Sequence, residues 1–148
     1  MTMKIFMVVT ITIISVPMIV FSQVPMSSKD TLTINAGNFK SDSGQAVVML
    51  FRKEDDLPAK PFMKTTGAIH NLKSVFIFAD IPFGEYAAIL LHDENSIGMV
   101  DHSWLGFPKE PLGFSNGWEL TIFSGMPSFA KLVFEFSKQK LEYKIDIQ

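Results

Sequence analysis

The sequence has 148 residues, with 13 basic side chains, 15 acidic side chains and no cysteine, and its formal net charge at pH 7 is −2. A mildly acidic chain without a basic cluster lacks the surface that attracts phosphates, so we expect no nucleic acid partner. The absence of cysteine excludes disulfide bonds. The fold must therefore depend on the burial of apolar side chains, among which phenylalanine is abundant, with 14 residues.

Residues 1–22 have the pattern of a secretory signal peptide. One cation precedes an apolar and hydroxyl-rich run from Ile5 to Phe21, and small or medium residues lead to the expected cut after Ser22. An uncleaved membrane anchor would need about 20 apolar residues, and this run is shorter and is interrupted by Pro17. The sequence therefore predicts an exported protein, periplasmic or secreted. Its mature part is one domain, residues 23–148, without a transmembrane span after cleavage.

Alternating apolar and polar residues predict strands along most of the mature chain. β-Branched and aromatic side chains recur in six segments, at residues 31–34, 45–52, 73–79, 85–92, 132–136 and 141–147. A short strand is also expected from Trp118 to Phe123. One-sided alternation is typical of antiparallel sheets. The pattern therefore favours an all-β fold, an antiparallel β-sandwich of about seven strands.

Three finer expectations follow from the same pattern. Residues 45–52 are apolar on both faces, because Val48 and Leu50 add a second apolar side to the strand. The last two segments are joined by a short connection, Ser137 to Lys140, and are predicted to form a terminal hairpin. A helical turn is expected only within Pro61 to Asn71.

The irregular part of the chain is concentrated between Asp93 and Ser128. Glycine and proline recur there, and loops of this length are either functional or disordered. Disordered segments are poor in aromatic residues, whereas this one holds both tryptophans of the chain. We therefore expect one long ordered loop that serves as the interaction surface, with five candidate ligand-binding residues: Trp104, Phe107, Lys109, Phe114 and Trp118.

Three segments of the mature chain resemble a bacterial family known as domain of unknown function 2141. They are IPFGEYAAILLHDEN from Ile81 to Asn95, HDENSIGMVDHSWLGFPKEPLGFSNG from His92 to Gly117, and GMPSF from Gly125 to Phe129. The resemblance extends over about the whole mature chain. It implies an exported protein with an immunoglobulin-like or transthyretin-like sandwich and no established activity.

The start of the loop has oxygen-bearing residues at the spacing of a calcium site. Asp93, Asn95 and Asp101 stand where loop positions one, three and nine of such a site stand. However, Ile97 replaces an amide that the family commonly has, and Trp104 occupies the position of the bidentate carboxylate. The alternative is a strand-end turn in which the side chains of Asp93 and Asn95 bond nearby backbone N–H groups. We expect the turn and no cofactor, and a calcium-dependent module remains an alternative.

Two patterns invite an enzymatic interpretation. His92, Asp93 and His102 could ligate the metal of a hydrolase, although their spacing matches no familiar metal site. Gly113 to Gly117 fits the G-x-S-x-G pattern of a nucleophile elbow, but every histidine precedes it and no helix is expected after it. We therefore predict no catalytic residue. The favoured function is a non-enzymatic binding or envelope-associated module that uses residues 93–128 to bind an envelope or extracellular ligand.

Overall fold

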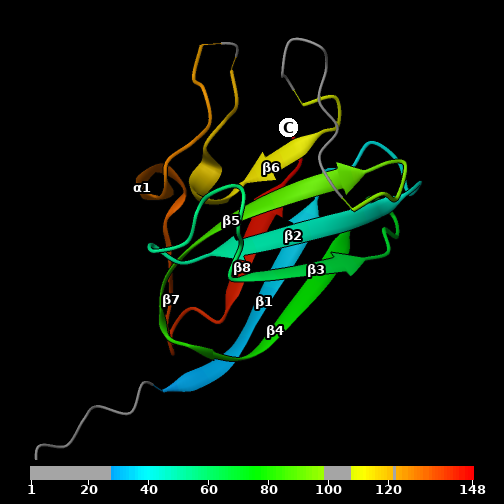
Figure 1. Cartoon of the computed structure of the whole chain (residues 1–148). Coiled ribbons are helices and arrows are strands. Elements are labelled where there is room, and N and C mark those ends of the chain that lie inside the picture. The colour runs from blue at the N-terminus through cyan, green and yellow to red at the C-terminus, as the bar shows by residue number, and fades with distance from the viewer. Residues whose placement is uncertain (1–27, 99–107, 122) are drawn as a thin grey trace, which may run out of the picture.

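The computed structural model describes residues 28–98, 108–121 and 123–148. Within these ranges the chain forms eight strands, a 3₁₀ turn and one four-residue helix, in the order β1 (Lys29–Gly37), β2 (Gln45–Phe51), β3 (Met63–Gly67), β4 (Ser74–Pro82), β5 (Gly84–Asp93), β6 (Leu112–Phe114), η1 (Ser115–Gly117), α1 (Phe129–Leu132), β7 (Phe134–Phe136) and β8 (Glu142–Asp146) (Figure 1). Among the described residues, no helix has the length and apolar character needed to cross a membrane.

The strands form two sheets, which confirms the all-β prediction. Sheet A has the order β4-β1-β8, and sheet B has the order β3-β2-β5-β6 with β7 added beside the first residues of β5. The pairs are antiparallel except for β1 and β8, which run parallel. Figure 1 shows β1 and β8 side by side, with β1 in the middle of sheet A and β8 at its edge.

A shared apolar core lies between the two sheets. Sheet A contributes Ile34, Phe76 and Phe78, which alternate with exposed or half-buried residues along β1 and β4. Sheet B contributes Val48 and Leu90 to the same cluster, and both are fully buried. Because strand side chains alternate between two faces, these residues define the inner face of each sheet.

Sheet B is also apolar on its outer face, as the sequence of β2 indicates. The outward residues Val47, Ile89 and Leu91 form a second buried cluster with Phe114 and with Leu132 of α1. The segment that runs from β6 through η1 and α1 therefore packs against this outer face (Figure 1). The loop residues around β6 and η1 are packed as predicted, whereas Phe123 and Met126 of the same loop are exposed.

The predicted terminal hairpin is wrong. Ser137 and Lys140 do form a bridge across a tight turn, but the two flanking strands enter different sheets. β7 pairs with β5, with Phe134 opposite Tyr86, whereas β8 pairs with β1. Alternation identified the inward residues, since Phe134 and Phe136 are buried. Alternation does not encode which strand becomes the hydrogen-bonding partner, and here long-range packing decides it.

Two further expectations need correction. The segment Pro61 to Asn71 contains β3 rather than a helical turn, because its β-branched Thr65 and Thr66 extend the edge of β2. The described residues of Trp118 to Phe123 contain no strand; the short strand lies earlier, at β6. Only three residues of β6 pair with β5, which is too short a run to show a clear period.

Candidate ligand-binding cleft

A row of four side chains crosses the outer face of sheet B. In the strand register, Lys64 of β3 is opposite Met49 of β2, Met49 is opposite Ile89 of β5, and Ile89 is opposite Phe114 of β6. Side chains of directly opposed residues point to the same face of a sheet. The row therefore begins with a cation at the β3 edge and continues as an apolar floor.

A cleft of about 430 Å³ lies over this floor. Leu91 and Leu112, which are also opposite each other, extend the floor. The walls come from the connection between β2 and β3 on one side and from the long loop on the other, and their lining residues are Pro58, Ala59, Pro61, Gly98, Pro108 and Met126. The volume falls in the range of about 300–1,000 Å³ that is usual for small-molecule sites.

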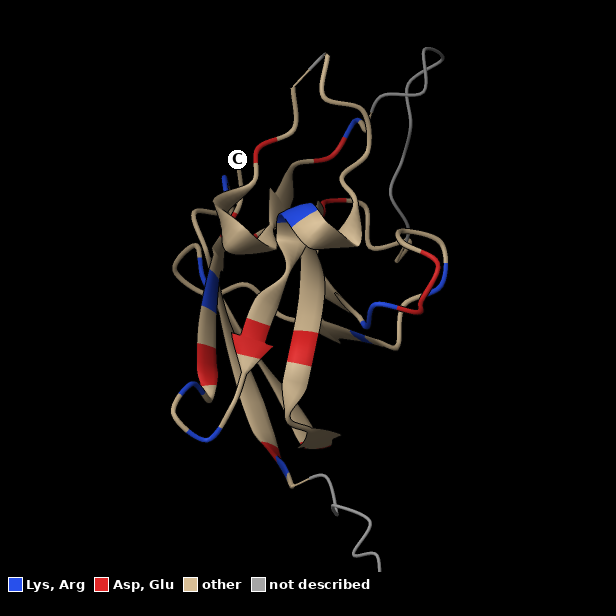
Figure 2. Ribbon diagram, turned by 90° about the vertical axis from the view of Figure 1, so that its left-hand side faces the viewer, with Lys and Arg blue, Asp and Glu red and all other residues tan. Residues whose placement is uncertain are grey.

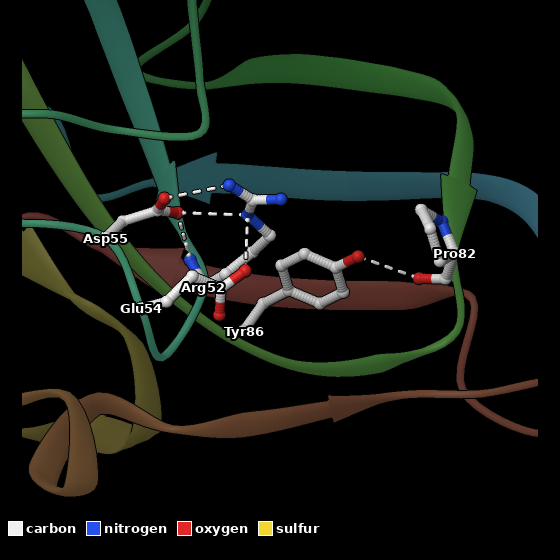
Figure 3. A network of polar contacts seen from close by, with 5 residues as sticks. All are labelled: Arg52, Glu54, Asp55, Pro82 and Tyr86. Carbon is white, nitrogen blue, oxygen red and sulfur yellow. Dashed lines mark hydrogen bonds and ion pairs between the residues drawn. The ribbon is translucent and has the colours of Figure 1, made fainter.

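The connection between β2 and β3 contains a charged network around Arg52 (Figure 3). The Arg52 guanidinium donates to both carboxylate oxygens of Asp55, at 3.0 and 3.2 Å, and its Nε lies 3.2 Å from Glu54. The guanidinium also lies over the Phe62 ring, 4.3 Å from its centre. Asp55 Oδ2 also accepts the backbone N–H of Arg52 at 2.7 Å. The Asp55 carboxylate therefore bonds both the backbone and the side chain of Arg52, and these bonds close the turn that precedes Pro58 and Pro61.

This network shifts the pKa values of its members. The hydrogen bond from Arg52 holds the pKa of Asp55 below its usual range, and the same bond raises the pKa of Arg52. Beside it, the Tyr86 hydroxyl donates to the Pro82 carbonyl at 2.8 Å (Figure 3). Burial raises the pKa of Tyr86. All three groups therefore keep their ordinary protonation state at neutral pH.

Lys64 is the charged residue of the cleft. Its ammonium donates a hydrogen bond to the carbonyl of Gly98, which ties β3 to the turn after β5. Within the described residues, no carboxylate forms an ion pair with Lys64. The other described residues that line the cleft are apolar or glycine.

Asp93 anchors the turn that carries Gly98. Its side chain is fully buried, and Oδ2 accepts hydrogen bonds from Gln45 Nε2 at 2.6 Å and from the Gly98 N–H at 2.7 Å. Oδ1 accepts the Ile97 N–H at 3.1 Å, which Asn95 Oδ1 also accepts at 3.1 Å. Burial by itself would raise the pKa of Asp93, but the hydrogen bonds lower it below its usual range. These are the contacts of the predicted strand-end turn.

A family model described as "Uncharacterized protein conserved in bacteria (DUF2141)" matches residues 34–144. The chain belongs to this family. The matched region of the DUF2141 domain runs from β1 to β8 and includes the floor and both described walls of the cleft. No curated protein and no solved structure matches the chain significantly.

Three of the five predicted ligand-binding residues lie in the described part of the DUF2141 domain. Phe114 is buried in the cleft floor, and Trp118 is half-buried with its ring edge-on to Phe114 at 4.8 Å. Lys109 is exposed. Trp104 and Phe107 lie outside the described residues, as do the calcium candidate Asp101 and the hydrolase candidate His102.

The side chains weighed for catalysis make structural contacts in the DUF2141 domain. His92 is fully buried and its Nε2 donates to the Ser43 carbonyl at 2.9 Å. Ser115 is fully buried as well. Its hydroxyl accepts the Ala88 N–H at 2.9 Å and donates to the Leu132 carbonyl, so it joins η1 to both β5 and α1.

Sequence reasoning missed one wall of the cleft and its cation. Pro61 and Lys64 belong to the segment Pro61 to Asn71, which was expected to hold a helical turn, and Pro58 lies just before that segment. One signal was available, because a strand that is apolar on both faces must have a covered outer face. The prolines that follow β2 are the nearest segment that could provide part of that cover.

Proposed function

We propose that this DUF2141 protein is an exported, non-enzymatic binding module that holds the apolar part of a small envelope or extracellular ligand in the cleft. The observation that supports this proposal is the cleft itself. Its floor is a row of large apolar side chains, Met49, Ile89 and Phe114, and its volume is about 430 Å³. Removing apolar surface from water contributes about 25 cal/mol per Å², so this floor favours a hydrocarbon or aromatic ligand.

The contacts of the polar side chains favour binding over catalysis. His92 and Ser115 are fully buried, and each has its hydrogen bonds directed to backbone groups. A general base or nucleophile must instead reach the reacting group of a substrate. The cleft presents apolar atoms and one ammonium group among its described residues.

The distribution of charge supports a ligand other than nucleic acid. Lys and Arg residues are interspersed with Asp and Glu residues along the strands and connections in Figure 2, rather than gathered on one face. Binding of a phosphate backbone depends on a basic patch or stripe. Together with the signal peptide pattern of residues 1–22, this supports an envelope location and a ligand found there.

For the fold we propose a transthyretin-like rather than an immunoglobulin-like sandwich. The Tyr86 hydroxyl bonds the carbonyl of Pro82 four residues upstream, as the tyrosine does at the corner of many immunoglobulin-like domains. However, β1 and β2 lie in different sheets, whereas the first two immunoglobulin strands share one sheet. The strand order therefore favours the transthyretin-like type over the immunoglobulin-like type.

Binding of a neutral fluorescent probe tests the proposed function. N-phenyl-1-naphthylamine, which is apolar and uncharged, should bind the processed protein saturably and gain fluorescence. Ala59 is an exposed residue in the cleft wall, so Ala59→Trp should fill the entrance and weaken binding by about tenfold or more, a loss of roughly 1.4 kcal/mol.

The matched control is Ala79→Trp. Ala79 is also exposed but belongs to β4 in sheet A, away from the cleft. This variant should bind the probe like the unchanged protein. Absence of saturable binding, or equal binding by Ala59→Trp and Ala79→Trp, would overturn the proposal.

A further inference from the structure

We infer that the ligand of the cleft is a single-chain anionic amphiphile, a hydrocarbon chain with a carboxylate head that pairs with Lys64. This inference rests on the proposed binding function and adds the chemical class of the ligand. It follows from the position of one cation at the end of an otherwise apolar row on the outer face of sheet B.

The register places the cation and the floor in line. Lys64 stands on β3, the edge strand of sheet B, and the apolar side chains of Met49 and Ile89 follow it across β2 and β5. Neighbouring strands are about 4.8 Å apart. A chain that lies along this row would cross from the Lys64 ammonium over β2 and β5 to Phe114, a span of three strand spacings or about 14 Å. That span accommodates about ten carbons of an extended chain.

The ammonium has capacity for such a head group. Lysine carries three N–H donors, and the described residues show one of them directed to the Gly98 carbonyl. Within the same residues, Lys64 has no carboxylate partner and the cleft has no second charged side chain. An added carboxylate would therefore meet a positive charge without a competing acid in the described lining.

The cation also selects against other ligands. A quaternary ammonium head would be repelled by Lys64, and an alcohol head would gain a neutral hydrogen bond in place of a charge-assisted one. Because the side chain of Lys64 is exposed, the pair resembles a solvent-exposed ion pair. We expect a preference of about two- to fivefold for the carboxylate over the alcohol.

Calorimetric titration of the processed protein with decanoate, decanol and decyltrimethylammonium tests the inference. Decanoate should bind about two- to fivefold more tightly than decanol, and decyltrimethylammonium more weakly than both. Lys64→Met should remove the difference between decanoate and decanol while decanol still binds. Lys64→Arg, which keeps the charge, should retain the difference. High salt should reduce it, because ions screen an exposed pair.

Lys73→Met is the control for a general change in charge, since Lys73 is exposed near the opposite sheet, outside the cleft lining. It should keep the preference for decanoate. Equal affinity for decanoate and decanol in the unchanged protein, or an unchanged preference in Lys64→Met, overturns the inference but leaves the binding function standing. Failure of all three ligands and of the neutral probe overturns the binding function as well.

Discussion

Replacement of Asp93 by Asn should destabilise the domain although the two side chains have nearly the same shape. In the native protein the buried carboxylate accepts three N–H groups, from Gln45, Ile97 and Gly98, at distances of 2.6–3.1 Å. Asparagine has one oxygen and one NH₂ group in the place of the two oxygens. If the asparagine oxygen keeps the hydrogen bond from the Ile97 N–H, the asparagine NH₂ group takes the place of the oxygen that accepted from Gly98 and Gln45. A donor then faces the Gly98 N–H and the Gln45 NH₂ group.

The magnitude follows from these contacts. A hydrogen bond to a charged group contributes about 1.5–3 kcal/mol, and a neutral bond about 0.5–1.5 kcal/mol. Loss of the charge weakens the bonds to Gln45 and Gly98, and the Gly98 N–H is left opposite a donor. We therefore expect Asp93→Asn to lower the free energy of unfolding by about 2–4 kcal/mol. At about 4 °C per kcal/mol for a domain of this size, the melting temperature should fall by about 8–16 °C.

The same change should alter the dependence of stability on pH. The pKa of Asp93 is lowered in the folded protein, so the ionised carboxylate contributes stability that is complete above its unfolded pKa of about 3.9. That contribution is lost as the pH falls through the lower, folded pKa. The difference in stability between native protein and Asp93→Asn should therefore be constant from about pH 5 to 8 and should shrink below about pH 4.

Thermal unfolding followed by circular dichroism at several pH values measures both effects. Asp56→Asn removes the same charge from an exposed side chain and should change the free energy of unfolding by less than about 0.5 kcal/mol. If Asp93→Asn melted within about 2 °C of the native protein at pH 7, the structural role assigned to the Asp93 carboxylate would be refuted.

Three other predictions follow from burial, from ligand geometry and from the N-terminal sequence. Phe134→Ala should cost about 3–5 kcal/mol in chemical denaturation because Phe134 is 6% exposed, whereas Phe123→Ala should cost less than about 0.5 kcal/mol because Phe123 is 96% exposed; similar costs would contradict the assigned core. Millimolar calcium should shift the melting temperature by less than about 1 °C, because the Asp93 oxygens already accept N–H donors. A larger shift that disappears in Asp101→Ala would favour a calcium site. The mass of the protein isolated from its native envelope should correspond to a chain that begins at Gln23, and a full-length mass would contradict the signal peptide.

Much of the two-sheet fold could be predicted because its strands are long and alternate clearly. β1, β2, β4 and β5 were each expected from period-two patterns, and the family was identified from the stretch around His92 to Gly117. The inward face of the last two strands was also identified, since Phe136 and Ile145 are buried. These features depend on local sequence, which alternation reports directly.

The strand partners and the cleft could not be predicted for a physical reason. Pairing of β8 with β1 joins residues more than a hundred positions apart, and no local pattern carries that choice. The cleft likewise needs the register of four strands, because Lys64 and Phe114 come into one row only through three pairings, of β3 with β2, of β2 with β5 and of β5 with β6. The candidate residues expected from the sequence, four aromatic side chains and Lys109, were all taken from the loop between Asp93 and Ser128, and a search confined to that loop could not select Lys64 on an edge strand.

The cleft exists because the cover of sheet B is incomplete. A central strand such as β5, apolar on both faces, requires cover on its outer side as well as its inner side. The four-residue helix α1 covers one end of that face, where Ser115 joins Leu132 to the backbone of Ala88. Farther along β5, Ile89 and Leu91 are flanked by separate proline-containing walls rather than by a packed helix. The nearer wall is braced within its own connection by the contacts of Arg52 with Asp55 and Phe62, and the gap over Ile89 and Leu91 lies between this wall and the one from the long loop.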